Sequence, residues 1–200
     1  MLPVVCYVKR PTRKVKLTRK KKMIKTVLYI ATSLDGFIAR PDGNIDWLTS
    51  IPSPQTGDYG YAEFLNSIGT TIMGRKTYNE IIGFGVDWPY IGLDSYVVTS
   101  DKELKIQSPE TNLLTEKIKD FVAETKSKTN KDIWLIGGGQ LITTFINEGL
   151  LDKMIITVIP KIIGEGIPLF ADKPKETNWK LIEAKSFDTG VVNLTYEKAD

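Results

Sequence analysis

Two basic side chains stand at an unusual place in the sequence, directly after a strand pattern that ends in glycine. Arg75 and Lys76 follow Gly74 and open a segment with helical periodicity. Cations normally avoid the N-terminus of a helix, because the helix dipole is positive there. The arrangement makes sense if an anion such as phosphate binds to these side chains and to the free backbone amides. A helix start in plain solvent is the alternative that these residues leave open.

A second candidate for phosphate binding is a run of three glycines. The segment Ile133-Trp-Leu-Ile-Gly-Gly-Gly-Gln-Leu-Ile142 predicts a buried strand, a glycine turn and an apolar helix. Glycines at such a turn let backbone amides surround a pyrophosphate without interference from Cβ atoms. The spacing matches neither the GxGxxG motif nor a P-loop, so a tight strand-to-helix turn is the competing interpretation.

Two further strand patterns end in polar residues. Val98 is followed by the hydroxyls of Thr99 and Ser100, which could hold a sugar phosphate or simply form a turn. The first strand pattern leads into Asp35-Gly36. Because α/β proteins place ligands in loops at the carboxyl ends of strands, both segments are candidate binding loops.

The residue types that are absent narrow the chemistry. The chain contains no histidine and a single cysteine, Cys6. This excludes Ser-His-Asp and Cys-His catalysis, HExxH zinc sites, four-cysteine zinc clusters and Fe–S ligation. Catalysis must then use carboxylates, hydroxyls, Lys, Arg, backbone amides or an organic cofactor, and we expect no metal. One cysteine forms no intrachain disulfide, so we expect a reducing, cytoplasmic setting.

The elements that must position these residues are those of an α/β fold. After Met23, short β-branched runs alternate with helical-period segments, as in βαβ units over a mainly parallel sheet. The predicted strands are 25–32, 70–73, 95–99, 112–115, 132–136, 153–160, 179–187 and 191–197. The predicted helices are 59–68, 76–82, 116–128 and 140–148. Asp188-Thr-Gly190 predicts a hairpin that makes the eight-stranded sheet antiparallel at its C-terminal end, and Gly149 suits a left-handed helix cap.

Charge is divided unevenly along the 200 residues. The net charge is +3, yet residues 1–22 hold nine of the 27 basic residues and no acidic one. The remainder has 18 basic residues against 24 acidic ones, a net charge of −6. We interpret residues 1–22 as a basic N-terminal extension, either a disordered tail or an over-extended reading frame with Met23 as the start. Residues 23–200 form a single domain in this interpretation, and no stretch predicts a signal peptide or a membrane span.

Six short motifs occur in a characteristic order between residue 23 and the C-terminus. They are Ser33-Leu-Asp-Gly36, Asp46-Trp-Leu-Thr49, Ile72-Met-Gly-Arg-Lys-Thr-Tyr78, Val97-Val-Thr-Ser100, Ile136-Gly-Gly-Gly139 and Gly164-Glu-Gly-Ile-Pro-Leu-Phe170. Together they resemble the dihydrofolate reductase superfamily, and specifically its small stand-alone relatives of the C-terminal reductase domain of bacterial riboflavin biosynthesis. The resemblance implies a dihydrofolate reductase-like fold, with about four helices around a mixed, mostly parallel sheet.

The resemblance also implies a nicotinamide nucleotide, usually NADPH, across the carboxyl ends of the strands. Ala31 and Ile38 would then flank the nicotinamide, and the three glycines would hold the pyrophosphate. The adenosine 2′-phosphate would meet Arg75, Lys76 and Ser100. The implied cofactor-binding residues are Ala31, Ile38, Gly74, Arg75, Lys76, Thr77, Thr99, Ser100, Ile136, Gly137, Gly138, Gly139 and Gln140.

Two departures from the family pattern bear on the substrate. Riboflavin-pathway reductases commonly carry Glu before the glycines, where this chain has Ile136. Folate reductases place a carboxylate in the first helix, where the nearest acids here are Asp58 and Glu63. Trp47 either covers the substrate edge or is a core residue. Without histidine, the proton donor is bound water or one of the acids Asp35, Asp46, Asp58 and Glu63.

We therefore expect a reductase that transfers a hydride from NADPH to a small-molecule substrate, either pteridine-like or similar to 5-amino-6-ribosylaminouracil phosphate. The alternative is a non-catalytic nucleotide-binding module of the same fold. The basic residues 1–22 raise nucleic-acid binding as a third possibility, but we expect neither nucleic acid nor a membrane as partner. A homodimer is expected from the resemblance and from the apolar C-terminal strands.

Overall fold

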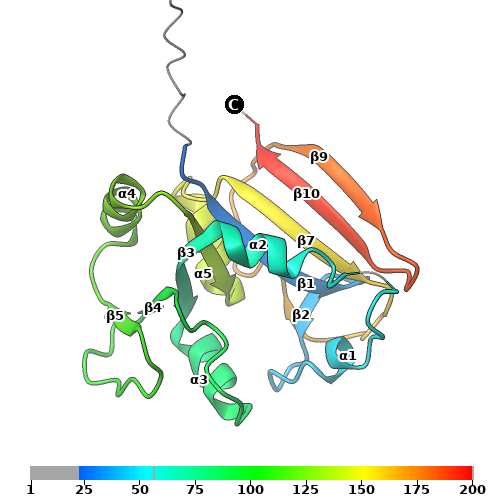
Figure 1. The fold of residues 1–200 in the computed structure, drawn as a ribbon, viewed down its shortest axis with the longest axis horizontal. Helices are drawn as coiled ribbons and strands as arrows, with labels where there is room; N and C mark the ends of the chain where they lie inside the picture. Colours follow the sequence, from blue (N-terminus) through cyan, green and yellow to red (C-terminus); the bar gives the residue numbers. More distant parts are fainter. Residues whose placement is uncertain (1–22, 56, 200) are drawn as a thin grey trace, which may run out of the picture.

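The computed structural model describes residues 23–55 and 57–199, so the basic extension predicted at 1–22 lies outside the described residues. One sheet contains eight strands: β1 (Thr26–Ser33), β3 (Ile68–Gly74), β4 (Asp94–Val98), β5 (Thr111–Leu114), β6 (Asp132–Gly137), β7 (Lys153–Ile159), β9 (Trp179–Ser186) and β10 (Val192–Lys198). Their spatial order is β5-β4-β3-β6-β1-β7-β10-β9 (Figure 1). The predicted eight-stranded sheet is confirmed.

The direction of the strands changes near one end of the sheet. The six strands from β5 to β7 in the spatial order are mutually parallel, whereas β10 runs antiparallel to both β7 and β9. A tight turn joins β9 to β10, in which the Phe187 amide donates to the Val191 carbonyl at 2.9 Å. The predicted antiparallel hairpin at the C-terminal end is therefore confirmed.

Helices cover both faces of the parallel part of the sheet. The two on one face are α2 (Tyr61–Ser67) and α3 (Arg75–Gly83), and their apolar side chains pack with Val27, Met73 and Trp134. On the other face, α4 (Ile118–Lys128) and α5 (Gly139–Asn147) pack against Leu28 and Leu135. The carboxyl ends of the central strands therefore lie at an edge of the sheet between the two helix layers.

The predicted helix cap after α5 is confirmed. Gly149 has a φ of +70°, and its amide donates to the Ile146 carbonyl at 3.0 Å. The next amide, that of Leu150, donates to the Phe145 carbonyl at 2.8 Å, which completes a Schellman motif. The chain is thereby turned directly into β7.

Three short elements were not predicted: β2 (Phe37–Ala39), α1 (Asp46–Thr49) and β8 (Ile167–Pro168). β2 and β8 pair with each other as a separate two-stranded sheet. Elements of two to four residues are too short to show a hydrophobic period, and this pairing joins segments far apart in the sequence. Among the described residues, no helix is long and apolar enough to cross a membrane.

The predicted start of the helix at residue 59 is wrong. Tyr59 and Gly60 have φ values of +60° and +86°, outside the helical region. The Asp58 carboxylate accepts hydrogen bonds from the amides of Gly60 and Ala62, at 3.1 and 2.7 Å. The helix begins only at Tyr61 because the two residues before it have a left-handed backbone, and the Asp58 carboxylate binds an amide on each side of this start.

Candidate functional site

Carboxyl ends of parallel strands meet at one edge of the sheet. In the strand register Gly74 at the end of β3 lies opposite Val98 of β4, and Met73 lies opposite Gly137 of β6. A Cβ atom placed on Gly74 would be 3.8 Å from the Gly137 carbonyl oxygen. The segments that the sequence singled out at 72–78, 97–100 and 136–139 are therefore neighbours in space. Their role in cofactor binding stays a prediction.

Two helices begin at this edge without a side-chain cap. α3 starts after Gly74 and α5 after Gly138, and neither N-cap residue has a side chain that could accept from the first amides. Uncapped amides and the positive ends of two helix dipoles suit an anion. The Thr77 hydroxyl accepts a hydrogen bond from the Gly138 amide at 3.0 Å and so ties the two helix starts together. These residues fit a dinucleotide whose phosphates lie between the helices.

The glycine turn is held from behind by the segment that contains β8. A Cβ atom at Gly139 would lie 2.9 Å from the Pro168 carbonyl oxygen and 3.1 Å from the Cβ of Ala171. The Thr143 hydroxyl of α5 donates to the Ala171 carbonyl and fastens the same segment. Gly139 is therefore required by close packing, and the motif at 164–170 acts as a brace for the turn.

Replacing Gly139 with Ala should lower both the stability and the nucleotide affinity of the protein. The added methyl group meets backbone, so the turn must shift at a cost of about 1–3 kcal/mol. For a domain of this size we expect a fall of roughly 2–12 °C in the melting temperature. Gly83→Ala in α3 is the matched control, because its Cβ meets nothing within 4 Å. Equal melting temperatures for the two variants would contradict the proposed brace.

The residues predicted to meet a 2′-phosphate lie on this edge and face solvent. Arg75, Lys76 and Ser100 are all exposed, and Thr99 is half-buried. Arg75 Nη1 lies 3.3 Å from the carboxylate of Asp101, a residue that sequence reasoning did not assign to the site. Gln140 is exposed in the first turn of α5. The Arg75 guanidinium thus has an acidic neighbour, Asp101, from the loop after β4.

A second group of polar atoms lies further along the sheet, on the face that carries α2. Ala31 of β1 is the register partner of Thr157 in β7, and Thr157 is the partner of Asn193 in β10. The Thr157 Oγ1 and the Asn193 Oδ1 are buried and have no hydrogen-bond partner. The Asn193 amide donates to the Tyr59 carbonyl at 2.7 Å, which leaves its oxygen available. Unpaired buried polar atoms are costly, so a ligand is a natural partner for them.

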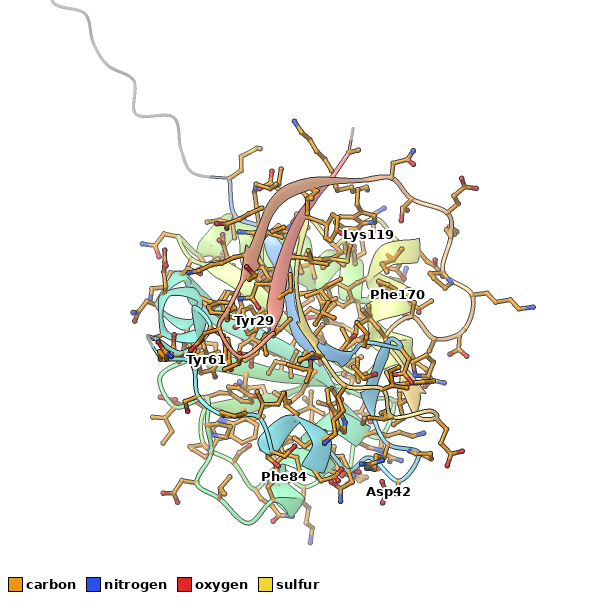
Figure 2. The ribbon with its side chains drawn as sticks, turned by 90° about the vertical axis from the view of Figure 1, so that its right-hand side faces the viewer. Tyr29, Asp42, Tyr61, Phe84, Lys119 and Phe170 are labelled. Carbon is orange, nitrogen blue, oxygen red and sulfur yellow. The ribbon has the colours of Figure 1, made fainter. Side chains whose placement is uncertain are left out.

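Aromatic side chains border these polar atoms. Tyr29, two residues before Ala31 in β1, stacks on Phe64 of α2 with ring centroids 4.4 Å apart. The ring of Tyr61 lies 6.0 Å from Tyr29, and Figure 2 shows these two side chains together. Ile136 packs against the same cluster, so it faces this region and not the outer rim of the glycine turn. Rings and unpaired polar atoms together match a flat heterocycle.

Burial is the main cause that raises the pKa of the Tyr29 phenol. The Thr157 hydroxyl lowers this pKa, although its Oγ1 makes no hydrogen bond of normal geometry. The nearby charge of Asp58 raises the pKa further. Burial, followed by the charge of Asp58, also raises the pKa of Tyr61. Both phenols are therefore protonated at neutral pH and can donate a hydrogen bond to a bound molecule.

The four candidate acids differ in what they contact. A hydrogen bond from Ser33, together with the amides of Gly164 and Ile163, lowers the pKa of Asp35. The hydrogen bond from Arg40 lowers the pKa of Asp46, and the two groups form an ion pair at 2.6 Å. These two acids brace loops as carboxylates, and Glu63 is exposed on α2. Asp58 is the acid whose charge acts on the Tyr29 and Tyr61 phenols.

Trp47 and the two predicted nicotinamide neighbours lie in different clusters. Trp47 is fully buried with Ile159 and Val191, its indole N–H has no partner, and Ala31 packs against this group. Trp47 is thus part of a buried cluster, and its contact with the substrate edge stays a prediction. Ile38 packs instead against the cluster beneath α5. The flanking role of Ala31 and Ile38 stays a prediction.

Some residues that the structure brings into the site carry no sequence signal of their own. Tyr29, Thr157 and Asn193 belong to three strands, and only the pairing register places them in one group. The one available hint is a polar residue on the buried face of each strand. In the part of the chain that the structure describes, no group of three or more Asp, Glu, Cys or His side chains could hold a metal ion.

Comparison with known proteins gives one family match and similar full-length relatives. Residues 92–193 match the model of the RibD C-terminal domain. The Bacillus subtilis (strain 168) protein YwjB, of uncharacterised activity, is 39% identical over 175 residues, which are 88% of this chain and 98% of YwjB. A candidate riboflavin biosynthesis protein of Shewanella sp. PV-4 has 29% identity and a TM-score of 0.80, over 88% of this chain and 100% of that one.

The same fold occurs in a structure solved with a nucleotide. The dihydrofolate reductase of Enterococcus faecalis, complexed with NADP(H) and RAB-propyl, has a TM-score of 0.62 and 17% identity. The match covers 88% of this chain and 97% of that enzyme. At this identity the likeness establishes the fold, and the expected dihydrofolate reductase-like fold is confirmed.

Proposed function

Because the chain belongs to the RibD C-terminal domain family, we propose that it is an NADPH-dependent reductase of a small heterocyclic substrate. The observation that carries this proposal is the pair of uncapped helix starts at the carboxyl edge of the sheet, joined through Thr77 and Gly138. The second observation is the group of unpaired polar atoms on Thr157 and Asn193, which the rings of Tyr29 and Phe64 border. One region suits the phosphates of a cofactor and the other suits a flat ring.

The cofactor-binding residues divide into two groups. The amides at the start of α5 and the glycines before it would hold the pyrophosphate, and Arg75 with Ser100 would hold a phosphate at the adenosine 2′ position. When bound, the nucleotide supplies a hydride from C4 of its nicotinamide ring. The protein binds, orients and keeps water away from the reacting atoms. The brace formed by residues 164–170 holds the glycine turn in place for this task.

For the substrate we propose a pteridine-like ring or an aminouracil that carries a ribosyl phosphate chain. Both are flat, and both present hydrogen-bond donors and acceptors along one edge. Asn193 Oδ1 can accept from such an edge, while the Tyr29 phenol can donate to it. Ile136 offers no carboxylate, so an aminouracil would be held without the acidic contact common in riboflavin-pathway reductases.

The proton that accompanies the hydride is assigned here to Asp58, directly or through a bound water. Among the four candidate acids, it alone acts on the phenols of the proposed substrate pocket. Asp35 and Asp46 are held in loop contacts with Gly164 and Arg40, and neither is among the charges that act on these phenols. A carboxyl group next to the substrate replaces the histidine that this chain lacks.

A non-catalytic nucleotide-binding module is the second candidate. The cofactor edge alone would be enough for such a module, since nucleotide binding needs no substrate pocket. The unpaired Thr157 and Asn193 atoms weigh against it, because a module without a substrate has no use for them.

A thermal-shift panel with the full chain tests the proposal. NADPH present at 100 times its dissociation constant should stabilise the protein by about 2.7 kcal/mol, which corresponds to roughly 5–11 °C. A pteridine or aminouracil should add a further shift in the presence of oxidised nucleotide. Stabilisation by nucleotide without any further shift would favour the binding module, and no shift with any nucleotide would refute both candidates.

We also propose that the protein is a homodimer formed through the C-terminal strands. β9 is an edge strand with Leu181 and Ile182 each 50% exposed, and no helix in the coloured part of Figure 1 covers it. An exposed apolar edge strand can pair with a strand of another chain. Sedimentation at micromolar concentration should give a dimer that Ile182→Lys shifts to the monomer. Ile162→Lys, on another exposed apolar residue, should leave the dimer intact, whereas a monomeric wild type would contradict the proposal.

We propose no nucleic-acid or membrane partner and a cytoplasmic setting. The single cysteine fits a reducing compartment, and residues 23–200 carry a net charge of −6, which disfavours binding to polyanions. If residues 1–22 bound nucleic acid, the affinity would fall steeply with salt and vanish on their removal.

A further inference from the structure

The exposed guanidinium of Arg75 has a fixed acidic neighbour at the proposed cofactor edge. Arg75 Nη1 and Asp101 Oδ2 are 3.3 Å apart, and the two side chains are 51% and 42% exposed. Arg75 comes from the start of α3, whereas Asp101 follows the end of β4. The pair therefore bridges the two segments between which an adenosine ribose would lie.

The carboxylate of Asp101 is held in place by its own loop. Its backbone amide donates to the Thr99 hydroxyl at 3.0 Å, and its Oδ1 accepts from the Glu103 amide at 3.0 Å. This is a turn in which an aspartate accepts from the amide two residues later. With Oδ1 occupied in this way, Oδ2 is directed to Arg75. The position of the Asp101 carboxylate is therefore set by its own loop.

We propose that Asp101 is a specificity-determining residue that limits the preference of this chain for NADPH over NADH. The inference rests on the proposed function and deepens it. A 2′-phosphate that binds Arg75 shares the guanidinium with the Asp101 carboxylate, or displaces it, and lies beside its negative charge. A free 2′-hydroxyl carries no charge and is not repelled by a carboxylate at this place. The acid thus weakens the phosphorylated cofactor without penalising the other one.

The size of this effect follows from the exposure of the pair. Exposed ion pairs and exposed like-charge neighbours each have modest energies, because water screens them. Removal of the charge should therefore strengthen binding of a 2′-phosphate about two- to tenfold. The effect should shrink at high salt, where both contributions are screened.

The test compares adenosine 2′,5′-bisphosphate with adenosine 5′-monophosphate by isothermal titration on the full chain. These probes differ only at the 2′ position, and neither can be turned over. Asp101→Asn keeps an oxygen that can accept from the Glu103 amide and removes the charge. Glu103→Gln is the matched control, because it removes the same charge two residues away and leaves the Arg75 contact intact. NADPH and NADH are titrated in parallel.

We expect Asp101→Asn to raise the affinity for the 2′,5′-bisphosphate and for NADPH about two- to tenfold, with the monophosphate and NADH unchanged within about twofold. Glu103→Gln should change the ratio by less than twofold. If Asp101→Asn leaves the ratio unmoved, or if Glu103→Gln moves it equally, the role of Asp101 is refuted while nucleotide binding by the wild type stands. If the wild type binds neither probe nor either dinucleotide, the proposed function fails as well.

Discussion

Replacing Arg75 with Ala is expected to weaken NADPH binding about tenfold to a hundredfold and NADH binding much less. A guanidinium can hold a phosphate through two parallel hydrogen bonds, and charge-assisted bonds contribute about 1.5–3 kcal/mol when they are shielded from water. Each 1.4 kcal/mol corresponds to a factor of ten. Arg75 is half exposed without a nucleotide, so the adenosine itself must provide part of this shielding.

Lys119→Ala provides a control, since this exposed lysine lies on α4 and belongs to none of the segments assigned to the cofactor. Its removal should leave both affinities unchanged. Equal losses for NADPH and NADH in Arg75→Ala would assign Arg75 to the pyrophosphate or to the fold. No loss for either nucleotide would remove the cofactor site from this part of the chain.

Asp58→Asn should lower kcat/KM about a hundredfold with the substrate that the wild type reduces. General acid catalysis by a positioned side chain contributes roughly 10²- to 10⁴-fold, and an amide cannot supply the proton. Asparagine has one acceptor oxygen, so it keeps the hydrogen bond from the Ala62 amide and loses the one from Gly60, a change that the fold should tolerate. Nucleotide affinity should stay the same, which separates a loss of chemistry from a loss of binding.

Glu63→Gln is the matched control for Asp58, as both acids belong to the α2 region and Glu63 is exposed. Its kcat/KM should remain within about twofold of the wild type. A hundredfold loss in Glu63→Gln with normal turnover in Asp58→Asn would reverse the assignment. Normal turnover in both variants would point to bound water as the proton source.

Most of the sheet could be predicted because each long strand carries its own hydrophobic pattern. β1, β6 and β7 are buried on both faces and read as runs of apolar residues, and α5 has a clear apolar face. The sequence pattern wrongly predicts a helical Tyr59, because its left-handed backbone goes with hydrogen bonds from the Gly60 and Ala62 amides to Asp58, which show no sequence period. β2 and β8 escaped prediction because each is stabilised by the other and not by a local period.

The candidate site could be predicted only where one short segment contains it. Arg75, Thr77 and the glycine turn follow strands directly, so their common edge could be inferred from parallel topology. The contact between Arg75 and Asp101 joins positions 26 residues apart, and the Thr157–Asn193 row depends on the register of two strand pairs. Such contacts exist only after the chain has folded, which is why the substrate side was left open.

Transfer of deuterium from NADPH labelled at C4 of the nicotinamide into a product is the most direct test of the central claim. The full chain is incubated with labelled NADPH and, in separate reactions, a dihydropteridine and an aminouracil ribosyl phosphate, and the products are examined by mass spectrometry. We predict that one of the two substrates yields a reduced product that carries a single deuterium, with matching oxidation of NADPH. Bound but unoxidised NADPH in every reaction, with no labelled product, would contradict the assignment as a reductase.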